Sequence, residues 1–169
     1  MAVFLVIMIG VLVAADQIVK NWAVEVLQPV GSMDFIHFGD FKILDLTYLE
    51  NRGAIFGSMA GQRWFLVGFT SLVIIAGIVF MFMSLKRSKL FVVAVGLFVA
   101  GGLGNLIDRI RLGYVVDMFE IKLFNFAIFN VADICVTTAF VMLMVYGIFI
   151  EPKIEKAKAE SGKEAEDNA

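Results

Sequence analysis

The sequence has little cysteine, histidine or charge, and each shortage argues against a class of site. Its 169 residues include one cysteine, one histidine and 18% charged residues, against roughly 25% charged residues in an average soluble domain. Because Cys135 is alone, it can form no internal disulfide, and the chain has no Cys/His cluster of the kind that binds a metal. We expect Cys135 as a packing residue and His37 in a loop, not as a ligand.

The balance of acidic and basic residues argues against nucleic acid as a partner. The formal net charge is −2, whereas a nucleic-acid-binding surface needs a patch of basic residues. We therefore expect no nucleic-acid partner, and the few metal-binding residue types lead us to expect no metal and no cofactor.

Hydrophobic residues, in contrast, are abundant and clustered. They make up 60% of the chain, and the mean hydropathy is +0.89. A membrane-spanning helix needs about 20 mostly apolar residues, and four stretches approach that length, at about 1–22, 64–85, 90–107 and 131–150. The pattern therefore predicts an all-α membrane protein with four transmembrane helices, formed by residues 1–150.

The first stretch has an alternative interpretation as a cleaved signal peptide, since Val13-Ala14-Ala15 resembles a cleavage site. The basic segment that usually precedes such an apolar run is missing, however. Residues 1–15 would form only about 22 Å of helix, less than the roughly 30 Å apolar thickness of a bilayer. We expect a retained helix that continues to Trp22, an aromatic residue at the membrane interface.

Basic residues set the expected orientation. Three of the five residues in the link 85–89 are basic, and cytoplasmic loops carry the excess of lysine and arginine. We therefore expect this link and both termini in the cytoplasm, with residues 151–169 as a solvated tail. The tail adds four lysines: Lys153, Lys156, Lys158 and Lys163.

The loops at about 23–63 and 108–130 then face outward. In the first loop, the run from Lys42 to Tyr48 has strand-type composition, with Leu44, Leu46 and Tyr48 on one face. This predicts a small extracytoplasmic β-rich loop domain. The same loop carries apolar residues that would either cover a site or form a plain interfacial surface: Met33, Phe35, Ile36, Phe38 and Phe41.

Charged residues within apolar stretches are costly in a bilayer and are therefore candidate functional residues. Asp16 and Lys20 are four residues apart and share one helix face, so they form either a structural ion pair or a contact with substrate. Asn105 and Arg109 share a face in the same way. Arg109 has an alternative as an interfacial anchor whose side chain reaches the lipid headgroups. The glycines before Asn105 would let another helix come close.

Two acidic residues stand among apolar neighbours at the outward ends of the third and fourth stretches. Asp117 lies between Val116 and Met118, and Asp133 lies in the opening turn of the fourth stretch. One buried carboxylate alone is ordinarily a helix cap or half of an ion pair, whereas two at the same depth favour chemistry. Spacing alone leaves both interpretations open.

Four sequence blocks occur in order along the chain. Residues 16–20 read D-Q-I-V-K, residues 51–57 read N-R-G-A-I-F-G, residues 101–117 read G-G-L-G-N-L-I-D-R-I-R-L-G-Y-V-V-D, and residues 129–133 read F-N-V-A-D. Their order and spacing resemble those of lipoprotein signal peptidases from residue 16 to about residue 150. Ile55 departs from that family, in which many members carry a second alanine at this position.

The resemblance implies a membrane aspartic endopeptidase of the bacterial cytoplasmic (inner) membrane, with its active site near the outer face. Such enzymes remove the signal peptide from a prolipoprotein whose cysteine carries diacylglycerol, and they cut just before that cysteine. By the same resemblance, Asp117 and Asp133 are the catalytic pair. Supporting positions, in substrate binding or in holding the pair, fall on Asp16, Lys20, Asn51, Gly53, Asn105, Arg109, Asn130 and Ala132. We expect a monomer that contacts its lipid-modified substrate and membrane lipid.

Two close carboxylates suit peptide hydrolysis because like charges cannot both ionise cheaply. One carboxyl group then holds a proton while the other activates water. Asp133 is expected to be the more readily ionised member, because it lies near a helix N-terminus, where the helix dipole favours negative charge.

Two other function classes compete with a peptidase. A small ion or proton transporter would use the intramembrane aspartates as a relay, and it would need polar residues along the whole depth of the bundle. In this sequence they cluster at one end of the stretches. A non-catalytic assembly factor that binds lipoproteins would keep an apolar groove but would not need both aspartates.

Overall fold

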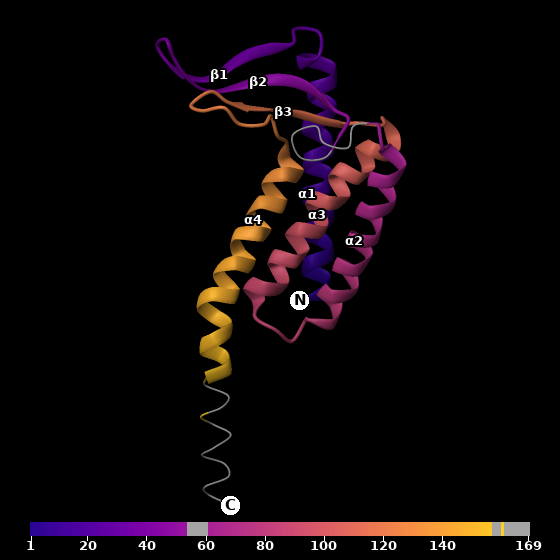
Figure 1. Ribbon diagram of the computed structural model, residues 1–169, viewed down its shortest axis with the longest axis vertical. Coiled ribbons are helices and arrows are strands. Elements are labelled where there is room, and N and C mark those ends of the chain that lie inside the picture. The colour runs from indigo at the N-terminus through magenta and orange to yellow at the C-terminus, as the bar shows by residue number, and fades with distance from the viewer. Residues whose placement is uncertain (54–60, 157–159, 161–169) are drawn as a thin grey trace, which may run out of the picture.

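Four long helices stand side by side, and a small sheet crosses one end of them (Figure 1). The computed structural model describes residues 1–53, 61–156 and 160. The helices are α1 (Ala2–Trp22), α2 (Arg63–Met83), α3 (Lys89–Arg111) and α4 (Val131–Val145). Short π-helical segments extend α1 over Ala23–Leu27 and α4 over Tyr146–Ile150. Within the described residues, these four helices are long and apolar enough to cross a membrane, which confirms the predicted fold class.

Helix α3 is the centre of the bundle and packs against α1, α2 and α4. Its glycines allow this because they bring the helices closer than a side chain would permit. A Cβ atom on Gly101 would clash with the carbonyl oxygen of Ala132 and would lie 2.7 Å from a methyl carbon of Val136. A Cβ atom on Gly104 would lie 2.5 Å from the Asp16 carboxylate. The glycine-rich segment therefore has the packing role that its composition predicted.

Two helices continue beyond the expected ends of their spans. Helix α3 runs to Arg111, past residue 107, so the polar residues at its end remain in helical register. Arg63 donates hydrogen bonds to the carbonyl oxygens of Arg109 (2.8 Å) and Ile110 (2.7 Å), and these bonds satisfy carbonyls that a helix end leaves without partners. The helical segment that begins at Val131 continues to Lys156, into the stretch expected as a solvated tail. Lys158 and Lys163 lie outside the described residues.

The sheet combines strands from both loops that were expected to face outward. Strands β1 (Ser32–Phe38) and β2 (Phe41–Asn51) form a hairpin, and β3 (Val115–Ile121) pairs with β2, so the order is β1-β2-β3 with antiparallel neighbours. The predicted strand is present and longer than expected, and the third strand comes from a segment that sequence analysis treated only as a loop. His37 lies in β1, not in a loop, because its run of alternating residues pairs with β2.

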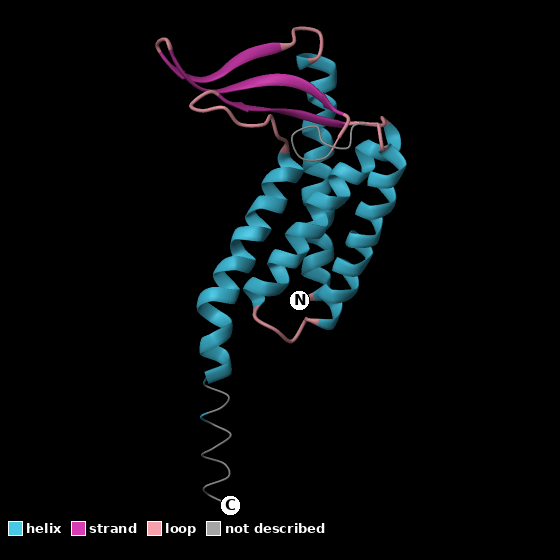
Figure 2. Cartoon of the chain, in the orientation of Figure 1, coloured by secondary structure: helices cyan, strands magenta, loops and turns pink. Residues whose placement is uncertain are grey.

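The hairpin and β3 cross above the helices (Figure 2). Leu46 of β2 is buried with Ala23, Leu27, Val116 and Met118, in a cluster that joins the end of α1 to the sheet. Nearer the turn of the hairpin, the apolar side chains are exposed. They are the five that sequence analysis singled out in this loop: Met33, Phe35, Ile36, Phe38 and Phe41. Each of these side chains is exposed on the β1–β2 hairpin.

Candidate active site

The first turn of α4 is closed by a capping box. Asn130 is the N-cap residue, and its side-chain oxygen accepts a hydrogen bond from the backbone N–H of Asp133 at 2.9 Å. In return, Oδ2 of Asp133 accepts the backbone N–H of Asn130 at 3.1 Å. Asp133 therefore has the capping role that a single carboxylate would have by default. The same bonds fix its carboxylate at the end of the helix that faces the sheet.

Asp117 reaches the same point from β3. Its side chain is buried, with 1% relative exposure, and both of its oxygens accept hydrogen bonds from asparagines. Oδ1 accepts Nδ2 of Asn130 at 2.6 Å, and Oδ2 accepts Nδ2 of Asn51 at 3.0 Å. Asn130 therefore touches both aspartates, and β3 and α4 bring together two acids that are sixteen residues apart in the sequence.

A second asparagine supports Asp133 from α3. Asn105 donates through Nδ2 to Oδ1 of Asp133 at 2.8 Å. The oxygen of Asn105 accepts from Lys20 at 2.9 Å and from Asn130 at 3.0 Å. Each carboxylate oxygen of the pair thus has a donor, and α3 connects the pair to α1.

A buried ion network lies beneath the pair. Nζ of Lys20 is 2.9 Å from Asp16 and 3.0 Å from Asp108, and all three side chains are at most 3% exposed. Asp16 also accepts the backbone N–H of Ala132 at 2.9 Å, so it ties the start of α4 to α1. Asp16 and Lys20 form the structural ion pair that was one of the two alternatives. Both side chains are buried.

Arg109 and Gly53 join the end of β2 to α3. Nη2 of Arg109 donates to the carbonyl oxygen of Gly53 at 3.0 Å, and the N–H of Gly53 donates to Oδ1 of Asn51 at 3.1 Å. The guanidinium therefore holds backbone next to Asn51, which differs from the interfacial anchor considered as an alternative. Ile55, the residue that departs from the family pattern, lies outside the described residues.

All ten residues singled out from the sequence therefore lie in one connected network. Sequence analysis missed Asp108, which lies in the third block between Asn105 and Arg109. Its signal was available, because residues three and four apart share a helix face and Asp108 follows Asn105 by three. Cys135 is buried in α4, as expected of a packing residue.

The surroundings of Asp117 favour its protonated form. Burial, reinforced by the charge of nearby Asp133, raises the pKa of the Asp117 carboxyl to about 7, while the bonds from Asn51 and Asn130 act in the opposite direction. A buried carboxyl group beside a second carboxylate is the arrangement that separates an acid from a base. Asp133 is less buried than Asp117, so it is the member of the pair that solvent can reach.

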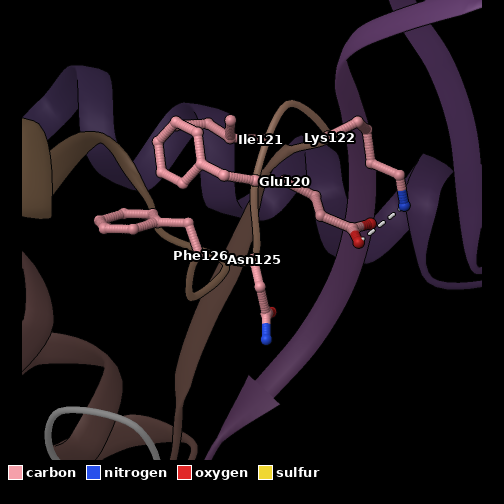
Figure 3. Close-up of a pocket in the computed structure, with 6 residues that line it drawn as sticks. Glu120, Ile121, Lys122, Asn125 and Phe126 are labelled. Atoms are coloured by element: carbon pink, nitrogen blue, oxygen red, sulfur yellow. Dashed lines mark hydrogen bonds and ion pairs between the residues drawn. The ribbon is translucent and has the colours of Figure 1, made fainter.

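A hollow at the β3–α4 loop is a different feature. It has a volume of about 300 Å³, and Glu120, Lys122, Asn125 and Phe126 are among its lining residues. Figure 3 shows the side chains of Glu120 and Lys122 paired with each other, at 2.9 Å. None of the ten network residues lines this hollow, so we place the candidate site at the aspartate pair.

Comparisons with known proteins agree with this arrangement. Residues 8–149 match the family model described as signal peptidase (SPase) II. The chain is 41% identical over 140 residues to the lipoprotein signal peptidase of Lactococcus lactis subsp. lactis, covering 83% of this chain and 89% of that one. It is 38% identical over 152 residues to the lipoprotein signal peptidase of Clostridium acetobutylicum, covering 88% and 95%.

Two solved structures have a similar fold, and both are described as bacterial membrane enzymes. One has a TM-score of 0.73 at 28% identity and covers 84% of this chain and 85% of that chain. The other has a TM-score of 0.72 at 26% identity and covers 87% and 94%. Nothing in these matches favours a transporter or an assembly factor. The family model spans most of the chain, and so the chain belongs to the signal peptidase II family.

Proposed function

We propose that the chain is a membrane aspartic endopeptidase that removes the signal peptide from diacylglyceryl-modified prolipoproteins, just before the lipidated cysteine. The observation that carries this proposal is that one residue, Asn130, donates to both carboxylates: its Nδ2 to Asp117 and its backbone N–H to Asp133. Two carboxylates held this way at the end of four apolar helices suit a substrate that stays in the bilayer. Family membership and the relatives' names support the reaction.

In the proposed reaction, Asp133 acts as the base and Asp117 as the acid. Asp133 is assigned the role of base because three groups hold its carboxylate in place: the backbone N–H of Asn130, the amide of Asn105 and the N-terminus of α4. It takes a proton from water, whose oxygen bonds to the scissile carbonyl carbon. Asp117 gives its proton to the leaving nitrogen as the C–N bond breaks. The pair titrates as a unit.

The pH dependence follows from the pKa of Asp117. Because the proposed acid must be protonated, activity should fall as pH rises through about 7. The Asn51 bond stabilises the ionised carboxylate, so Asn51→Ala should raise the pKa of Asp117 and move the falling limb of kcat/KM to higher pH. Initial rates between about pH 5 and 9 test this, with Asn125→Ala in an exposed loop as the matched control. A limb that stays in place or moves to lower pH would contradict the assignment.

The remaining network residues would have supporting roles. Asp16, Lys20 and Ala132 would fix the start of α4 against α1, Asn105 would orient Asp133, and Gly53 with Arg109 would hold Asn51 beside Asp117. We propose that residues 1–150 form the membrane peptidase domain and that it acts as a monomer without nucleic acid. The diacylglyceryl group would remain among membrane lipids, since burial of each methylene contributes about 0.8 kcal/mol.

We propose that both termini face the cytoplasm and that the aspartate pair lies near the outer face of the bacterial cytoplasmic membrane. The basic link between α2 and α3 lies at the opposite end of the bundle from the sheet (Figure 1), and basic loops remain in the cytoplasm. Single cysteines placed at Asp40 and Ser88, in a variant lacking Cys135, check this in intact cells. Only the cysteine at residue 40 should react with an impermeant thiol reagent.

The function is tested with purified protein and two synthetic prolipoprotein peptides that differ only in the diacylglyceryl group on cysteine. Mass spectrometry should show cleavage just before the lipidated cysteine and little cleavage of the peptide without lipid. Equal cleavage of both peptides would contradict the proposed requirement for the diacylglyceryl group. Absence of cleavage by folded protein, combined with proton flux in liposomes, would favour a transporter instead.

A further inference from the structure

Asp108 lies outside the set of residues so far given a role, yet it joins its own helix, α3, to two other elements of the site, α1 and β3. It is 2% exposed and lies on α3. Its Oδ2 is 3.0 Å from Nζ of Lys20 on α1 and accepts the backbone N–H of Val116 on β3 at 3.1 Å. Its Oδ1 accepts Nε2 of Gln17 at 2.9 Å. Both carboxylate oxygens are therefore used within the protein.

The bond to Val116 is the informative one. Val116 directly precedes Asp117, and its carbonyl oxygen accepts Nδ2 of Asn130 at 3.4 Å. The backbone of Val116, the residue before the proposed acid, is thus held on both sides of its Cα: its N–H donates to Asp108 on α3 and its carbonyl accepts from the cap of α4. A hydrogen bond that involves a charged group is stronger than one between neutral groups, so the carboxylate of Asp108 fixes where β3 places Asp117.

We propose that Asp108 is a positioning residue of the catalytic site: it holds the backbone of Val116 and shares Lys20 with Asp16, and so it sets the place and the electrostatic surroundings of the Asp117 carboxyl. The inference rests on the proposed function, because it assumes that Asp117 is catalytic. It concerns a residue that reaches the reaction only through Asp117.

The charge of Asp108 acts on Asp117 within a crowded set of ionisable groups. Lys20 and Asp16 face it from α1, Arg109 is its neighbour on α3, Tyr48 is near it on β2, and Asp133 approaches from α4 through Asn105. Lys20 lowers the pKa of Asp117. Removal of the negative charge of Asp108 leaves the Lys20 charge less balanced, so it should lower the pKa of Asp117.

Two variants separate the charge from the hydrogen bond. Asp108→Asn removes the charge, and replacement of Val116 by its α-hydroxy acid removes the N–H donor and leaves the Asp108 side chain unchanged. Because a displacement of about 1 Å in a reacting group can cost about 100-fold in rate, we expect each variant to lower kcat by about 10- to 100-fold with KM within about twofold of wild type. Asp108→Asn should also move the falling limb of the pH profile to lower pH, whereas the Val116 variant should leave it in place.

Asp45→Asn is the matched control. Asp45 is also a buried acid, 4% exposed and 3.8 Å from Lys122, but it lies on β2 away from the aspartate pair. It should keep wild-type kcat and pH profile. If the Asp108 variant does not fold, the Val116 variant decides the question, and wild-type kcat in that variant overturns the inference. A lower kcat in folded Asp108→Asn with an unmoved pH limb would also overturn it, since a merely structural role predicts that result.

Failure of the positioning role of Asp108 can be distinguished from failure of the proposed function. If wild type cleaves the lipidated peptide and variants of the aspartate pair do not, while both Asp108 and Val116 variants behave as wild type, only the positioning role fails. If variants of the pair still cleave the peptide, the proposed function itself fails.

Discussion

Asp117→Asn and Asp133→Asn should each lower kcat by at least about 10³-fold, because each removes one of the two proton transfers that the reaction needs. Asparagine keeps the size of the side chain and an oxygen that can accept a hydrogen bond. Asn at residue 133 can still accept the backbone N–H of Asn130, so the capping box need not open. Both variants should remain folded, but with a lowered melting temperature, because the new NH2 group faces a donor that the carboxylate oxygen accepted.

Cleavage of the lipidated peptide, followed by chromatography and mass spectrometry, measures this loss. The double variant should be no slower than the slower single variant, because residues that act as a unit are not additive. Asp40→Asn, in the turn of the β1–β2 hairpin, is the control and should retain wild-type kcat. More than about one tenth of wild-type activity in either single variant would exclude that residue from the pair.

Alanine would be a poorer substitution at residue 133. It would remove the carboxylate that accepts the backbone N–H of Asn130, and the loss of a helix-capping interaction typically costs about 0.5–2 kcal/mol. A loss of activity in Asp133→Ala would then combine catalysis with the stability of the first turn of α4. The asparagine substitution separates these two contributions.

The second large loss of activity is expected from substitution of a glycine that does not contact the aspartate pair. Gly101→Ala should lower activity by about 100-fold or more and lower the melting temperature. The new Cβ atom would clash with the carbonyl oxygen of Ala132 and press against Val136. Backbone atoms cannot rotate aside as the end of a side chain can, so α4 must move as a helix. Asp133 and Asn130 would move with it, while Asp117 would stay on β3.

Gly68→Ala provides the matched control. Gly68 also lies within a membrane-spanning helix, α2, but a Cβ atom there meets nothing within 4 Å. It should keep wild-type activity, and its melting temperature should stay the same or rise, since alanine is favoured over glycine in a helix by about 1 kcal/mol. Thermal melting in detergent and peptide cleavage measure both variants. If Gly101→Ala and Gly68→Ala behave alike, α3 and α4 do not need their close approach.

Much of the architecture could be predicted from hydrophobic length alone. Four apolar stretches required four helices because a bilayer core offers no water to satisfy backbone groups. The strand around Leu46 was predictable from its alternating pattern. Strand β3 was not, because its buried run Val115–Met118 alternates too little to be recognised as a strand, and its partner lies far away in sequence.

The residues proposed for the site could be named from the sequence, but their contacts could not. The isolated positions of Asp117 and Asp133, with the family blocks, led to the proposal of these two acids as the pair. That Asn130 contacts both of them depends on the angle at which β3 meets α4, and no local pattern encodes that angle. Asp16 and Lys20 were open to two interpretations because spacing on one helix shows that two residues can pair but not whether they are buried. The packing of α3 over them decides that.

Asn130 and Asp133 form the cap of the last helix in the chain, and this position has a consequence for biosynthesis. Asp117 leaves the ribosome before α4 exists, and at that stage its partner and the asparagine that joins them have not been made. The pair can assemble only after α4 has entered the membrane and docked against Gly101 and Gly104. On the proposed function, a nascent chain is therefore unable to cut peptides, and proteolytic activity arises only when the fold is complete.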